Sequence, residues 1–164
     1  MIILLIHLIF SFILDAFTSL YLNFSIETVS IFKTIYTIIS LVLIYNYFKN
    51  KNKYIIVLII SGILFDIVYT NTFILNIIIF VVIYLIINYL DYLMPNNIFT
   101  INIKSIISII TYYILTYLIM LLSNYSIYSF NLLIKIITHS ILMTIIYTTI
   151  SYLILKKINI KEIR

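Results

Sequence analysis

Two carboxylates, Asp15 and Asp66, stand inside long apolar stretches of this sequence. If those stretches cross a bilayer, an acidic group at its centre costs roughly 2.5–3.5 kcal/mol, and residues of this kind are often functional. Two alternatives fit both positions. Each carboxylate could make a polar contact inside a helix bundle or with a partner, or it could lie near the membrane surface, where water reaches it.

The histidines, His7 and His139, stand on separate apolar stretches, and the chain has no cysteine. Two isolated histidines without an acidic cluster make a poor metal site, and a proton relay would need a chain of acidic or histidine groups. We expect both to be packed polar groups. The single glycine, Gly62, leaves no glycine-rich phosphate loop, and no Ser-His-Asp or paired-carboxylate spacing is present. The sequence therefore predicts no catalytic residue, no metal and no cofactor.

The composition predicts a membrane environment. The 164 residues are 65% hydrophobic and 9% charged, and the mean hydropathy is +1.24. Too few polar residues remain to cover a soluble core, so the apolar surface must face lipid. A net charge of +5 could suggest nucleic acid, but the basic residues lie between apolar runs, where topology explains them. We expect no nucleic-acid partner and a single transmembrane domain over residues 1–164.

The apolar runs are long and continuous, which predicts helices, because every backbone amide in hydrocarbon must be satisfied internally. We predict an all-α integral membrane protein with a bundle of about six transmembrane helices. The runs cover residues 2–22, 28–48, 54–69, 73–93, 105–122 and 132–155. The third is near the lower length limit for a span and could instead form a helical hairpin with the fourth.

The basic residues predict the orientation. Lys49, Lys51 and Lys53 form the clearest boundary between apolar runs. Placing them in the cytoplasm also places Lys104 and the basic C-terminal tail there, with both termini inside. The lysines that fall on the other side, Lys33 and Lys135, are near helix ends and could extend to the headgroups.

One segment carries a family resemblance. In residues 62–80, GILFDIVYTNTFILNIIIF, Gly62 and Asp66 form a G-x-x-x-D pattern at the close of one apolar run, and Asn76 opens the next. This stretch resembles the best-marked region of MreD, the family of bacterial rod shape-determining membrane proteins. Members of that family usually carry further glycines, one turn before Gly62 and in the following turn. Here those places are taken by Leu58, Asn71 and Ile74.

The resemblance implies a non-enzymatic scaffold in the bacterial cytoplasmic membrane. Such a protein belongs to the elongasome, the machinery of lateral peptidoglycan synthesis and cell shape. Its expected partners are MreC, with the actin-like MreB, the glycosyltransferase RodA and a class B penicillin-binding protein. Gly62 and Asp66 would then shape the bundle or a partner-facing surface.

The competing class is the substrate-binding subunit of an energy-coupling-factor importer, which is similarly small and six-helical. Such subunits typically carry an A-x-x-x-A motif in the first helix, where this chain has Ala16 alone. A membrane protein of another family is the third alternative.

Overall fold

The computed structural model describes residues 2–21, 34–48, 50–70, 72–123 and 129–158. Within these ranges the chain is helical and contains no strand. The elements are α1 (Ile2–Tyr21), α2 (Tyr36–Tyr45), α3 (Lys51–Phe65), a π-helical turn η1 (Asp66–Thr70), α4 (Leu75–Leu93), α5 (Ile98–Leu122) and α6 (Phe130–Lys157). The prediction of an all-helical membrane bundle is confirmed.

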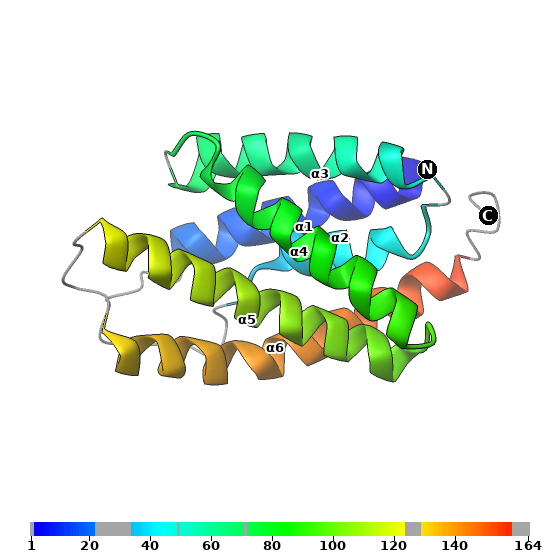
Figure 1. Cartoon of the computed structure of the whole chain (residues 1–164). Coiled ribbons are helices and arrows are strands. Elements are labelled where there is room, and N and C mark those ends of the chain that lie inside the picture. Colours follow the sequence, from blue (N-terminus) through cyan, green and yellow to red (C-terminus); the bar gives the residue numbers. More distant parts are fainter. Residues whose placement is uncertain (1, 22–33, 49, 71, 124–128, 159–164) are drawn as a thin grey trace.

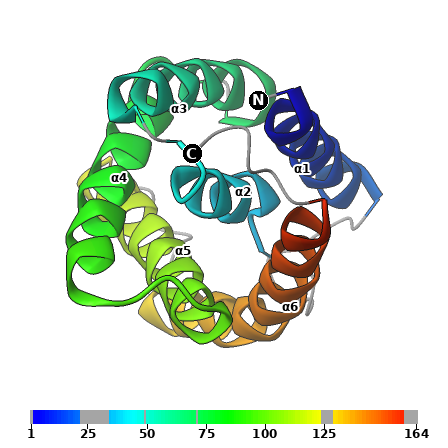
Figure 2. The same cartoon turned by 90° about the vertical axis from the view of Figure 1, so that its right-hand side faces the viewer.

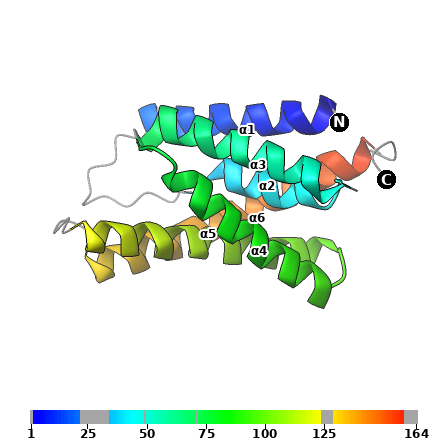
Figure 3. The same ribbon diagram turned by 45° about the horizontal axis from the view of Figure 1, so that its top comes forward.

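The helices form a ring around α2. Viewed along the bundle, α1, α3, α4, α5 and α6 surround it (Figure 2). All ten residues of α2 are buried. Its neighbours in contact are α1, α5 and α6, and to a lesser extent α3. The view in Figure 3 shows α1 and α3 on one side of α2 and the α5–α6 pair on the other. The bundle therefore has a helix, not an open channel, along its axis.

The two ends of the bundle differ in charge. Helix α1 begins, and α6 ends, at the end that we call the terminal end (Figure 1). Lys51 and Lys53, in the first turn of α3, and Lys156 and Lys157, in the last turn of α6, lie there. The opposite end, called the distal end, carries the turn between α3 and α4.

Five of the described helices are long and apolar enough to cross a membrane, and α2 is shorter. The second predicted span, residues 28–48, is wrong as a full-length helix. The described helical part is Tyr36–Tyr45, residues 46–48 are not helical, and residues 28–33 lie outside the described residues. Because α2 is enclosed by other helices, it does not need the length that a lipid-facing span requires.

Two helices begin earlier than predicted, because asparagines cap them. The side chain of Asn50 accepts from the amide of Asn52 and starts α3 at Lys51. Asn97 forms a capping box with Thr100 and starts α5 at Ile98, seven residues before the predicted position. The predicted third span consequently lengthens to Lys51–Thr70, enough to cross the membrane. The other boundaries agree to within about two residues.

Candidate functional site

Asp66 joins α3 to α4. It is 2% exposed, and its Oδ1 accepts from the backbone nitrogen of Asn76 at 3.0 Å and from Asn76 Nδ2 at 2.8 Å. The hydroxyl of Thr72 donates to the same oxygen at 2.5 Å. Asn76 is the second residue of α4, so the carboxylate caps an amide at the open, positive end of that helix. Tyr112 of α5 donates to Asn76 Oδ1 at 3.2 Å and adds a third helix.

Gly62 lies at a close approach between the same two helices. It lies four residues before Asp66, on the same face of α3. A Cβ at Gly62 would lie 2.9 Å from Cα of Ile77, closer than real side chains come. The G-x-x-x-D spacing thus places two contacts on one side of α3. Gly62 packs against the backbone of Ile77, and one turn later Asp66 caps the amide of Asn76.

Gly62→Ala is expected to lower the free energy of unfolding by about 2 kcal/mol, because the added methyl meets backbone that can move only if α3 and α4 separate. Equilibrium unfolding in mixed micelles of increasing SDS fraction measures this. Ser61→Ala is the matched control. Ser61 is also buried, and its hydroxyl bonds only Val57 O within its own helix. Equal stability of the Gly62 and Ser61 variants would contradict the close contact.

The turn before α4 contains a strained residue. Ile74, the N-cap residue of α4, has φ 72° and ψ −12°, and its side chain makes no cap hydrogen bond. A β-branched residue in this left-handed region is unfavourable by roughly 1–2 kcal/mol. Glycine, which has no Cβ, adopts this conformation without that cost.

Ile74→Gly should raise the free energy of unfolding by about 0.5–1 kcal/mol, since glycine removes the strain but gives the unfolded chain more freedom. The measurement is the same SDS titration. Ile78→Gly provides the control, because Ile78 is also exposed to the outside but lies inside α4, where glycine destabilises by about 1 kcal/mol. A loss of stability in both variants would mean that Ile74 is not strained.

Asp15 of α1 caps the start of α2 in the same way. It is 7% exposed, and its two oxygens accept from the backbone nitrogens of Tyr36 and Thr37, each at 2.8 Å. The Thr37 hydroxyl adds a third bond at 2.5 Å. These are the first two residues of α2. In both α1–α2 and α3–α4, a carboxylate from the first helix therefore caps the N-terminus of the returning helix. Both carboxylates therefore make polar contacts inside the helix bundle, which is the first of the two alternatives that the sequence raised.

The face of α1 that carries Asp15 makes further polar contacts with neighbouring helices. His7 and Ser11 precede Asp15 at intervals of four residues and so share its face. His7 Nδ1 lies 2.8 Å from the hydroxyl of Ser40 on α2. Ser11 contacts Ser40 and, at 2.7 Å, the hydroxyl of Tyr147 on α6. His7 is thus a packed polar group that helps to join three helices.

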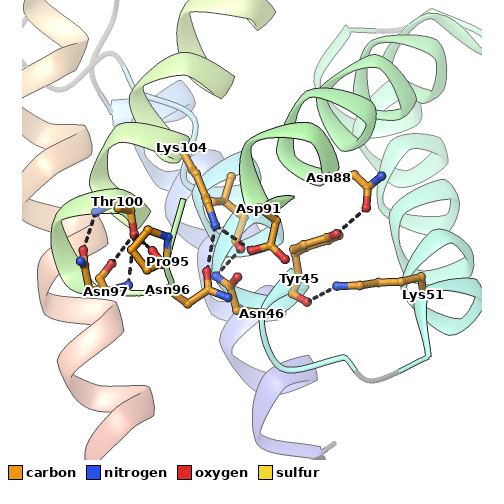
Figure 4. Close-up of polar contacts among 11 residues, drawn as sticks. Tyr45, Asn46, Lys51, Asn88, Asp91, Pro95, Asn96, Asn97, Thr100 and Lys104 are labelled. Atoms are coloured by element: carbon orange, nitrogen blue, oxygen red, sulfur yellow. Dashed lines mark hydrogen bonds and ion pairs between the residues drawn. The ribbon is translucent and has the colours of Figure 1, made fainter. Parts of the chain in front are cut away.

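A second polar cluster lies at the terminal end (Figure 4). The side chain of Lys104 on α5 is fully buried, and its Nζ donates to Asp91 Oδ1 at 2.7 Å and to Asn96 Oδ1 at 2.8 Å. The sequence placed Lys104 just before the fifth apolar run, on the cytoplasmic side. The predicted start of that helix is wrong, since α5 begins at Ile98 and includes Lys104. Because the Asn97 capping box starts α5 early, Lys104 falls inside the helix and faces the last turn of α4.

The same region holds the C-terminus of α2. The hydroxyl of Tyr45 donates to Asn88 Oδ1 at 2.7 Å. Lys51 Nζ donates to the carbonyl of Tyr45 at 3.3 Å and lies 3.3 Å from the centre of its ring (Figure 4). A cation at a helix C-terminus and an anion at its N-terminus both stabilise the helix dipole. Helix α2 is held in this way at both ends, by Asp15 and by Lys51.

The arrangement can position helices, and each described carboxylate is occupied in doing so. Asp15 and Asp66 cap helices, and Asp91 pairs with Lys104. Within the described ranges no group of three His, Asp or Glu residues could hold a metal ion. Sequence reasoning missed Asp91 and Lys104, although opposite charges on either side of the Pro95–Asn97 turn are a recognisable signal. It also missed the hydroxyl donors, since Thr and Ser are too common here to single out.

The fold and these polar clusters define a multi-pass, all-helical membrane protein whose buried polar groups serve helix packing. The chain matches no protein-family model, no curated protein and no solved structure.

Proposed function

We propose that this protein is an MreD-like scaffold of the bacterial wall elongation machinery, a non-enzymatic protein of the cytoplasmic membrane that works with MreC. MreB, RodA and a class B penicillin-binding protein are its further partners. The terminal end, with its four lysines at the starts and ends of helices, faces the cytoplasm by the positive-inside rule. Lateral peptidoglycan synthesis and rod shape are the processes that it serves.

The observation that carries this proposal is the unit formed by Gly62, Asp66 and Asn76. These are the residues on which the resemblance to MreD rests, and all three lie at the contact between α3 and α4, where Gly62 faces Ile77 and Asp66 accepts from Asn76. Because these residues contact each other's helices, their spacing in the sequence corresponds to a structural unit, which supports the resemblance. The role implied for Gly62 and Asp66, shaping the bundle, agrees with their geometry.

The burial of α2 favours a scaffold over an importer subunit. A substrate-binding subunit needs room for a ligand among its helices. Here α2 occupies the axis, and its ten residues are buried by the surrounding helices. The A-x-x-x-A motif expected of such subunits is also missing, since Ala16 is the sole alanine.

The test is a detergent pull-down of the tagged, full-length protein from its native membrane, analysed by mass spectrometry. Recovery of MreC together with RodA or a class B penicillin-binding protein is the expected result. Recovery of ATPase subunits and a transmembrane coupling protein would overturn the scaffold and make the chain an importer subunit. Recovery of neither set from a folded protein would also contradict the proposal.

Two matched variants separate the motif from general stability. Asp66→Ala and Asp15→Ala each remove one buried carboxylate that caps a helix, and only the first lies in the MreD-like segment. Compared at equal amounts of folded protein, Asp66→Ala should recover less MreC than Asp15→Ala. Equal recovery would mean that the segment around Asp66 does not support partner binding.

A further inference from the structure

Helix α6 carries an apolar groove on its lipid-facing side. Four aliphatic side chains and one threonine line it, and its volume is about 600 Å³. The lining residues are Thr138, Ile141, Leu142, Ile145 and Ile146. Leu142, Ile145 and Ile146 are exposed to the outside of the bundle. The groove is shallow and open to the outside, and its apolar lining, all from α6, can contact a hydrocarbon chain along one side.

A lysine lies on α6 about one turn before this groove. Lys135 is exposed and lies three residues before Thr138, on the same stripe of α6 as Leu142. In the part of the chain that the structure describes, its ammonium has no ion-pair partner. The described carboxylates are bound elsewhere, two as helix caps and one to Lys104. A cation on a lipid-facing surface is unfavourable unless it reaches an anion.

The imidazole of His139 lies beside Lys135, one turn further along α6. Its Nδ1 lies 2.8 Å from the carbonyl oxygen of Lys135. A carbonyl can only accept, so Nδ1 is the donor and Nε2 is the nitrogen available to a ligand. His139 thus binds the backbone of its own helix beside Lys135, and the ammonium of Lys135 is the group on this face that can receive an anionic oxygen.

The depth of these residues suits a phospholipid headgroup. Helix α6 has 28 residues, so it is about 42 Å long at about 1.5 Å per residue. The hydrocarbon core is about 30 Å thick, so each end of a centred helix extends about 6 Å beyond it. Lys135 is the sixth residue of α6 and therefore lies at the boundary at the distal end, with the groove below it in hydrocarbon.

We propose that α6 binds one anionic glycerophospholipid, with its phosphate at Lys135 and one acyl chain in the groove. The adjoining cation and apolar groove are continuous on one helix face and match the two parts of such a lipid. A partner helix would have to bring an acidic group to Lys135. The lipid supplies its phosphate at the depth where Lys135 already lies.

The test is native mass spectrometry of the full-length protein in mild detergent, with phosphatidylglycerol and phosphatidylcholine of equal chain length added. The wild type should retain more phosphatidylglycerol, and Lys135→Gln should bind it about five-fold more weakly. Ile145→Trp, which fills the groove, should weaken the binding of the same lipid. Equal retention of the two lipids by the wild type would overturn the proposal, as would an unchanged affinity in either variant.

A double variant shows whether the two residues act at one site. At a lipid concentration that fills the site in the wild type and empties it in each single variant, Lys135→Gln and Ile145→Trp should each lose one bound phosphatidylglycerol, and the double variant should lose no second one, because one lipid spans both residues. Lys157→Gln is the control. It removes an exposed lysine at the terminal end, and its effect should add to that of Lys135→Gln. Loss of two bound lipids from the double variant, one for each substitution, would mean two independent sites and contradict a single bound lipid.

Discussion

Asp91→Asn should lower the free energy of unfolding by about 3 kcal/mol, one of the two largest effects that we expect from a single side chain. The substitution leaves the fully buried ammonium of Lys104 without a countercharge. Breaking a buried pair from one side is strongly destabilising, because the remaining charge stays desolvated. Asn96 alone, at 2.8 Å from Nζ, cannot replace the carboxylate at 2.7 Å. SDS titration in mixed micelles gives the measurement.

Lys104→Met tests the cause. Methionine fills a similar volume without a charge and leaves the partly exposed Asp91 to be solvated, so a loss of less than about 1 kcal/mol is expected. The double variant Asp91→Asn with Lys104→Met should recover most of the stability lost in Asp91→Asn. If the two single variants were equally unstable, the loss would come from packing and not from a stranded charge.

Asp66→Ala is expected to lower the free energy of unfolding by about 3 kcal/mol. It removes the acceptor of the Asn76 backbone amide and one acceptor each of Asn76 Nδ2 and the Thr72 hydroxyl. The last two keep a contact with the hydroxyl of Thr70. Each buried donor that loses its partner costs about 1–3 kcal/mol. The threonine at the turn can reach water, which reduces the total. The same titration measures the loss, and the fraction of folded protein should fall in membranes as well.

Asp66→Asn separates the cap from the charge. The amide keeps one acceptor oxygen for the α4 amide, but its NH₂ group competes with Nδ2 of Asn76. An intermediate loss of about 1–2 kcal/mol is expected. A loss equal to that of Asp66→Ala would show that the negative charge, and not the acceptor, stabilises α4. Full stability in both variants would remove Asp66 from its assigned role in joining α3 to α4.

The fold class and the approximate spans follow from the sequence, because hydropathy and charge are local sums along the chain. Runs of apolar residues identified α1, α4 and α6 to within about two residues. The lysine clusters marked the terminal end. The sequence also predicted that Gly62 and Asp66 act on the same side of the third helix, since residues four apart share a helix face.

The partners of the buried polar groups could not be read in this way. Asp15 caps a helix 21 residues further on, and Lys104 turns inward instead of into water. These helices are apolar on nearly all sides, so the sequence pattern does not mark which face is inside. The central position of α2 and the strained backbone of Ile74 have the same origin. The sequence determined that this protein lies in a membrane, whereas helix rotation and neighbour choice, set by long-range packing, decided which residues meet there.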